Sequence, residues 1–158
     1  MPDESLASPT ALSTGGARGT AGTATDVRDV VMIKLPAIGA YLSVLRTATA
    51  GLAARLDFTL DEIEDLRIAV DEACAMLLVG ALPGATLDCR FELVQGAMSV
   101  SVTVTTEDGQ EPSRDTFAWT VLSALAGEVD SSVDLENRVT ISLLKRRTTA
   151  DSSFSGPA

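Results

Sequence analysis

The chain has 158 residues, a length that suits one domain, and 46% of them are apolar, which is enough for a globular core. Its net charge of −10 argues against a nucleic-acid-binding surface, which needs clustered lysine and arginine, and favours a basic protein partner. The absence of histidine excludes Ser-His triads, Cys-His pairs and histidine-ligated metal sites.

Both ends of the chain differ in composition from its middle. Residues 1–25 are rich in serine, threonine, glycine and alanine and predict a disordered tail, as do residues 148–158, so the folded part is expected over 26–147. No apolar run reaches the ~18 residues of a membrane span, and the N-terminus lacks the features of a secretory signal. We therefore expect a cytoplasmic protein without membrane contact, in which Cys74 and Cys89 are reduced and buried.

The first half of the folded part predicts a strand followed by two helices. The β-branched run at residues 30–35 ends at a proline and predicts a strand. Apolar residues then recur at spacings of three and four from Gly39 to Leu56, which is typical of one helix face. A longer helix is predicted from Thr59 to Gly80, and it opens with a capping box formed by Thr59 and Glu62.

After the second helix the apolar period changes to two, which is typical of strands. Residues 87–93 and 98–104 predict a hairpin, residues 117–126 a third helix, and residues 129–135 and 139–144 a final hairpin. The order β-α-α-ββ-α-ββ predicts an α+β fold, a two-layer sandwich with about three helices on one face of a mostly antiparallel sheet.

The second helix, LDEIEDLRIAVDEACAMLL, carries Asp71 and Glu72 inside an apolar run. A carboxylate there is costly unless it is paired or used, and Asp71 is predicted to be a solvated charge at the helix edge. This helix, with the strand DVVMIKLPA and the first helix YLSVLRTATAGLAARL, resembles the anti-sigma factor serine kinases. These are bacterial partner-switching regulators with the GHKL (Bergerat) ATPase fold. The resemblance covers about residues 28–146.

The resemblance implies ATP and Mg²⁺ as the family's cofactors, but the sequence departs from the family at several positions. Glu72 matches a glutamate that positions or activates the attacking group in phosphoryl transfer. The family's metal-binding asparagine is replaced by Met76, whose thioether is a poor ligand for a hard cation, so no metal ligand is predicted. Glu107 and Gly109 match the adenine-binding box, although Glu107 could equally be a surface acid at a hairpin end. The glycine-rich lid corresponds to residues 114–120, which lack glycine.

Four positions have alternative interpretations. Glu72 is either a retained catalytic base or a structural carboxylate paired with Arg67 or a later arginine. Arg46 matches a family arginine that contacts both the sigma factor and the antagonist, or it is an ordinary exposed helix residue. Phe117 and Trp119 are predicted to pack in the core rather than to stack on a ligand.

The resemblance implies an anti-sigma factor that sequesters an alternative RNA polymerase sigma factor in a stress response. An anti-sigma factor antagonist would release it, kinase activity would be weak or absent, and the protein would be a homodimer. An acidic chain suits the basic patches of sigma factors. One alternative is an active serine/threonine kinase that phosphorylates the antagonist with ATP and Mg²⁺. Another is an adaptor that binds only antagonists.

Overall fold

The computed structural model describes residues 28–149. The predicted tail 1–25 and all but the first two residues of the predicted tail 148–158 lie outside the described residues. The elements are β1 (Asp29–Pro36), a 3-10 turn η1 (Gly39–Tyr41), α1 (Leu42–Ala54), α2 (Leu60–Leu78), β2 (Thr86–Val94), β3 (Ala97–Thr105), α3 (Phe117–Ala126), β4 (Glu128–Val133) and β5 (Arg138–Arg146).

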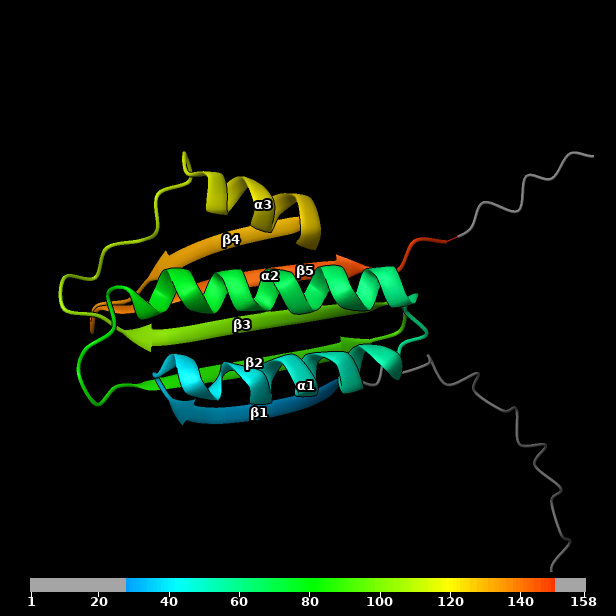
Figure 1. Ribbon diagram of the computed structural model, residues 1–158, viewed down its shortest axis with the longest axis horizontal. Coiled ribbons are helices and arrows are strands. Elements are labelled where there is room, and N and C mark those ends of the chain that lie inside the picture. The colour runs from blue at the N-terminus through cyan, green and yellow to red at the C-terminus, as the bar shows by residue number, and fades with distance from the viewer. Residues whose placement is uncertain (1–27, 150–158) are drawn as a thin grey trace, which may run out of the picture.

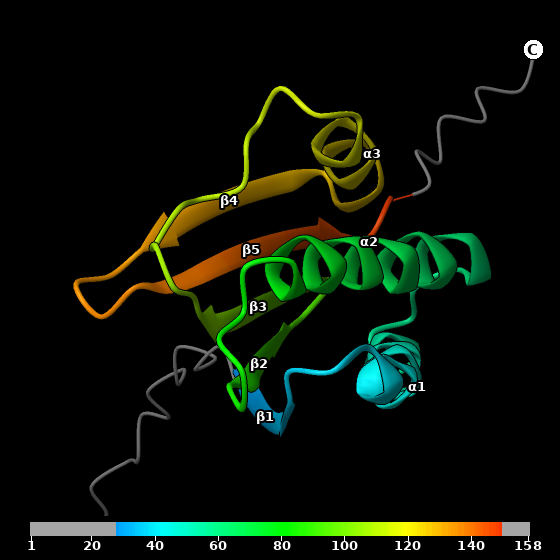
Figure 2. The same ribbon diagram turned by 60° about the vertical axis from the view of Figure 1, so that its left-hand side comes forward.

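The five strands form one sheet in the order β1-β2-β3-β5-β4, and every neighbouring pair is antiparallel. The three helices lie side by side on one face of this sheet, with α2 between α1 and α3 (Figures 1 and 2). The predicted α+β sandwich and its order of elements are confirmed. The order of the strands in space was not predictable from the chain, because the last hairpin places β5 rather than β4 next to β3.

The core lies between the sheet and the helices. Alternate residues of β2, β3 and β5 are buried under the helices, and the residues between them point to the open face of the sheet. The largest fully buried side chains include Phe91, Leu45, Leu66, Leu87, Met98, Leu122, Ile141 and Leu143. Both cysteines are free and buried as predicted, and burial raises the pKa of Cys89 to about 12, so its thiol stays protonated.

The start of α2 is fixed by the predicted capping box. The Thr59 hydroxyl accepts from the Glu62 N–H, and Glu62 Oε2 accepts from the Thr59 N–H at 2.8 Å. Glu62 Oε1 also accepts from the Thr148 N–H at 2.7 Å, which ties the end of β5 to the start of α2. Burial opposes ionisation of Glu62, but the hydrogen bonds from Thr148 and Thr59 outweigh it and lower the pKa of the carboxyl group.

We expect Glu62→Gln to lower the free energy of unfolding at neutral pH by about 1–2 kcal/mol, because an amide oxygen can replace only one of two charged acceptors. The folded-state pKa lies below the unfolded value of about 4.3. The contribution of Glu62 is therefore present above that pH and lost as the pH falls through the folded pKa. Urea unfolding at several pH values should show the difference between wild type and variant shrinking below about pH 4.

The control for this prediction is Glu64→Gln, two residues further along the same helix. Glu64 is exposed and pairs only with Arg67, so its loss should cost a few tenths of a kcal/mol. Equal losses for the two variants would contradict the role assigned to Glu62.

Candidate functional site

The middle of α2 carries Glu72 and Met76 one helical turn apart, and hence on one side of the helix. The same side includes Asp65, which lies 3.6 Å from Lys145 of β5. Glu72 is half-buried, and its carboxylate makes no hydrogen bond or ion pair with any residue in the range 28–149. The alternative in which Arg67 pairs with Glu72 is not observed, because Arg67 binds Glu64 at 2.7 Å.

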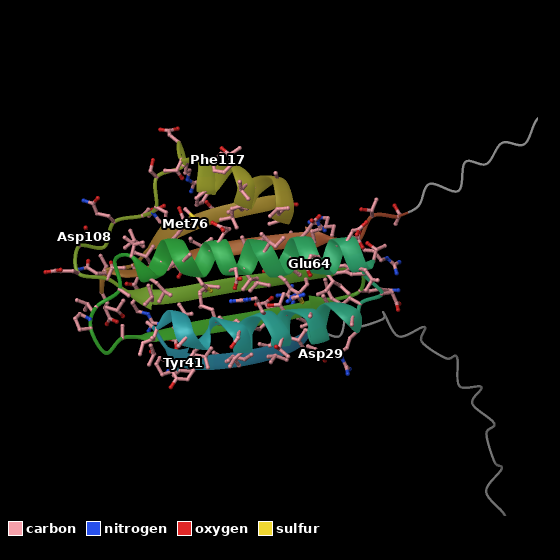
Figure 3. The ribbon with its side chains drawn as sticks, in the orientation of Figure 1. Asp29, Tyr41, Glu64, Met76, Asp108 and Phe117 are labelled. Carbon is pink, nitrogen blue, oxygen red and sulfur yellow. The ribbon has the colours of Figure 1, made fainter. Side chains whose placement is uncertain are left out.

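A small hollow of about 170 Å³ lies beside Met76, at the C-terminal end of α2. Its wall comes from α2, the loop after β3 and the start of β5, and Figure 3 shows Met76 and Asp108 at this end of the molecule. The lining residues are Met76, Leu77, Val79, Gly80, Thr106, Asp108, Gln110, Pro112 and Val139. Asp108 therefore lines the hollow, whereas Glu107, the predicted adenine acceptor, is exposed and does not.

The loop after β3 is held against the turn between β4 and β5. Thr106 donates from both its N–H and its hydroxyl to the Asn137 carbonyl, and the Asn137 amide donates to the Glu107 carbonyl. Gly109 has φ +62°, and a Cβ there would lie 2.5 Å from Asn137 Oδ1. The left-handed φ and the nearby Asn137 side chain both favour glycine at position 109, which gives this glycine a structural reason that involves no nucleotide.

The segment that replaces the glycine-rich lid is fastened to β4. Arg114 binds Asp130 at 2.7 Å and contacts Ser131, and its guanidinium lies 5.1 Å from the centre of the Trp119 ring. Ser131 also donates to Glu111 from the same loop. The Arg114 guanidinium and the Ser131 N–H lower the pKa of Asp130, which keeps it ionised in this cluster. We call Glu111, Arg114, Trp119, Asp130 and Ser131 the latch.

The two aromatic residues of this segment differ in their surroundings. Trp119 is buried as predicted, one turn into α3, whose start is capped by the Thr116 hydroxyl. The prediction for Phe117 was wrong, because its side chain is 83% exposed (Figure 3). As the first residue of α3, Phe117 precedes the turn that packs on the core, so its side chain has no apolar surface to cover it.

The residues at this site do not fit Mg²⁺·ATP. Ligand pockets usually measure about 300–1,000 Å³, and the hollow is smaller. Met76 offers sulfur where a hard cation needs oxygen. The latch also holds the lid segment against β4 rather than over the hollow. Glu72 remains a candidate catalytic base only because it occupies the position of the family's glutamate.

The first helix presents a separate surface. Arg46 pairs with Asp71 of α2 at 2.9 Å, so Asp71 is not the solvated edge charge that the sequence suggested. Arg46 nevertheless stays 45% exposed, on the side of α1 that faces α2. Ile38, Tyr41 and Val44 are exposed apolar side chains before and within this helix. These three residues and Arg46 form what we call the α1 surface.

Sequence reasoning missed the contacts between residues that lie far apart in the chain. The partners of Asp71, Arg114 and Asn137 were not predicted, since they lie 25, 16 and 30 positions away. The left-handed φ of +58° at Asn137 fits a turn between the predicted strands 129–135 and 139–144, but nothing in the sequence connects that turn to residue 109.

No protein-family model matches the chain. It is 31% identical over 110 residues to the serine-protein kinase RsbW of Halalkalibacterium halodurans, covering 69% of this chain and 63% of that protein. It is 33% identical over 93 residues to the anti-sigma-F factor RsbW of Mycobacterium tuberculosis, covering 59% and 55%. A shorter match of 46 residues reaches 48% identity with the serine-protein kinase RsbW of Bacillus subtilis, covering 29% of each chain.

A solved structure shares the fold. It contains the RsbU and RsbW domains of a protein from Mycobacterium tuberculosis, and it superposes with a TM-score of 0.59 at 16% identity over 77% of this chain and 35% of that one. The matches cover less than two thirds of the length of the first two RsbW relatives. Within residues 28–149 no helix combines the length and the apolar composition of a membrane span.

Proposed function

We propose that this chain, a relative of the RsbW serine-protein kinases and anti-sigma factors, is an anti-sigma factor that binds an alternative sigma factor without phosphoryl transfer. An anti-sigma factor antagonist would release the sigma factor by competing for an overlapping surface. The name of one relative, anti-sigma-F factor, supports the binding role. The cytoplasmic location, the homodimer and the role in a stress response remain predictions from the sequence.

One observation carries the choice of binding over catalysis. The helix that supplies the metal ligand in the resembling kinases here places Met76 against a hollow of about 170 Å³. Phosphoryl transfer depends on positioning and on charge neutralisation by the metal, and a thioether supplies neither. The chain keeps α1 and its exposed arginine, the part that the family resemblance links to partners.

An active kinase is the second candidate, because Glu72 is half-buried and has no partner among the described residues. We expect calorimetry with ATP and Mg²⁺ to show no saturable binding at micromolar concentration. Incubation with labelled ATP and an antagonist should transfer no phosphate. Binding at that concentration, with phosphate on an antagonist serine that is lost in Glu72→Ala, would establish the kinase and refute the proposal.

The binding role has its own test, an affinity pull-down from the native cell with and without ATP. We expect a sigma factor to be recovered equally in both cases. Recovery of an antagonist but no sigma factor would favour the adaptor alternative. This result would be distinct from the kinase outcome, because it does not depend on nucleotide.

A further inference from the structure

The face of the sheet that the helices leave open carries a local excess of positive charge. Over β1, β2 and the start of β5, four of the chain's twelve basic residues lie on this face beside two acids, although the chain as a whole has a net charge of −10. These six residues, which we call the open-face site, are Arg28, Lys34, Asp88, Arg90, Glu92 and Arg138. Such a concentration needs an explanation, because nothing in the anti-sigma proposal uses this face.

Each acid of the open-face site is shared by two bases. Asp88 lies 2.9 Å from Arg138 and 3.4 Å from Lys34. Glu92 is bound in the same way by two arginines, at 2.7 Å and 2.9 Å, which lower the pKa of Glu92 and keep it ionised. One positive charge therefore remains in each group. The two groups are centred on Asp88 and Glu92, four residues apart on β2, a separation of about 13.6 Å.

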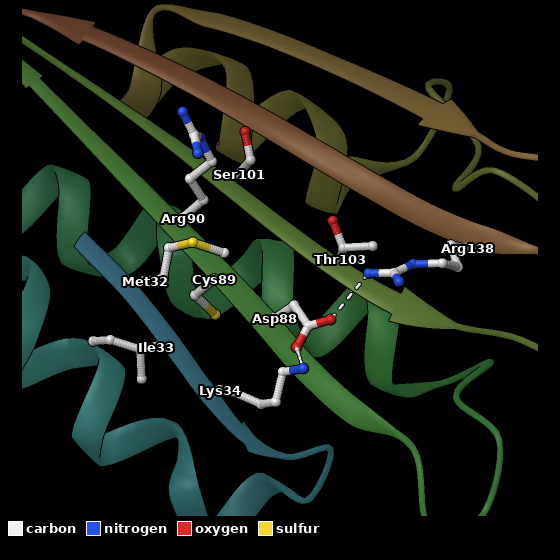
Figure 4. A pocket seen from close by; sticks show the side chains of 9 residues that line it. All are labelled: Met32, Ile33, Lys34, Asp88, Cys89, Arg90, Ser101, Thr103 and Arg138. Atoms are coloured by element: carbon white, nitrogen blue, oxygen red, sulfur yellow. Dashed lines mark hydrogen bonds and ion pairs between the residues drawn. The ribbon is translucent and has the colours of Figure 1, made fainter. Parts of the chain in front are cut away.

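A hollow of about 430 Å³ lies over this part of the sheet (Figure 4). Ser101 and Thr103 line it, and their hydroxyls pair with those of Ser142 and Thr140 at 3.1 Å and 2.7 Å. In each pair one hydroxyl donates its proton to the other, so the O–H of the accepting hydroxyl stays free to donate to a ligand. Met32 adds an apolar wall and is 71% exposed. The hollow thus offers hydroxyl donors and positive charge to a ligand, next to an apolar wall formed by Met32.

A second copy of this chain is a poor occupant of the site. A two-fold axis through the face would bring identical patches together, each with an excess of positive charge. Like charges across an interface oppose association. The charge therefore favours an anionic partner.

We propose that the open-face site docks an acidic segment of another protein, bound in extended conformation with carboxylates four residues apart. In an extended chain the side chains at i and i+4 point the same way and lie about 13.6 Å apart, which matches the spacing of the two positive groups. The free hydroxyls donate to the same carboxylates, and Met32 contacts their aliphatic stems. The site lies on the opposite side of the sheet from α1, so it is independent of the anti-sigma proposal.

Fluorescence anisotropy with a labelled peptide of alternating glutamate and serine tests this proposal on the full chain. We expect saturable binding at low ionic strength that weakens as salt is added, and no binding of the same peptide with glutamine for glutamate. Amide chemical shifts should change on β1 and β2. Shifts confined to α1 and α2 would overturn the proposal, and so would tighter binding of inorganic phosphate than of the peptide.

The variant pair Lys34→Gln and Arg90→Gln removes one charge from each group and should weaken peptide binding roughly tenfold. The control pair Arg55→Gln and Arg147→Gln removes the same charge from the end of α1 and the end of β5, and it should leave the affinity unchanged. Thermal unfolding checks that both pairs fold. Equal weakening by the two pairs would show a non-specific charge effect and refute the site.

Discussion

Reversing the charge at Arg46 is expected to abolish most of the affinity for the sigma factor. Arg46 is held by Asp71 in a fixed position and stays half-exposed on α1. An arginine fixed before binding loses little conformational freedom on binding, which is a property of interface hot spots. We expect Arg46→Glu to raise the Kd by about thirtyfold or more, equivalent to roughly 2 kcal/mol. Calorimetry with the sigma factor recovered in the pull-down gives this value.

Two further variants separate a contact from a charge effect. Arg55→Glu makes the same change at the end of the same helix, where the side chain has no ion pair among residues 28–149, and it should change the Kd less than threefold. Asp71→Asn keeps Arg46 but frees it, and its effect should fall between the other two. If Arg55→Glu weakens binding as much as Arg46→Glu, the α1 surface acts only through its overall charge.

Replacing Phe91 by alanine is expected to cost about 3–5 kcal/mol of folding free energy, much of the total for a domain of this size. Phe91 is fully buried at the centre of β2, beneath the helices. Its loss removes apolar contact area and leaves a cavity that the surrounding sheet cannot close. Urea unfolding should show a lower midpoint with an unchanged slope.

The control lies on the neighbouring strand. Met32→Ala removes a large apolar side chain from the open face, where it is mostly exposed, and should change stability by less than about 0.5 kcal/mol. A small effect at Phe91 would mean that the packing between sheet and helices is looser than the structure indicates.

The features that the sequence predicted depend on residues close together in the chain. The capping box joins residues three positions apart, and the strand alternation repeats every second residue, so both are visible in a short window. The contact of Gly109 with the Asn137 side chain depends instead on the strand order, because β5 lies next to β3 in the sheet. The latch likewise joins Arg114 to an edge strand.

Family resemblance gave the residues of the candidate site but not their surroundings. It identified Glu72, Met76 and Arg46 by position. It could not show that Glu72 lacks the expected arginine partner or that Arg46 is held by Asp71, because both depend on side-chain directions across two helices. The exposure of Phe117 was missed for a related reason, since an aromatic residue at a helix start has no periodic signal to place it.

The contact between Gly109 and Asn137 bears on how easily this chain could gain nucleotide chemistry. Substituting Met76 by asparagine would supply an oxygen ligand, yet the loop would still be pinned at Asn137 and the lid segment still held by Arg114. Each of these changes alone would loosen a packed contact without creating a usable pocket. A route to catalysis through single substitutions would therefore pass through variants that have lost one of these contacts before a nucleotide pocket exists. Such variants are expected to be less stable than the present protein.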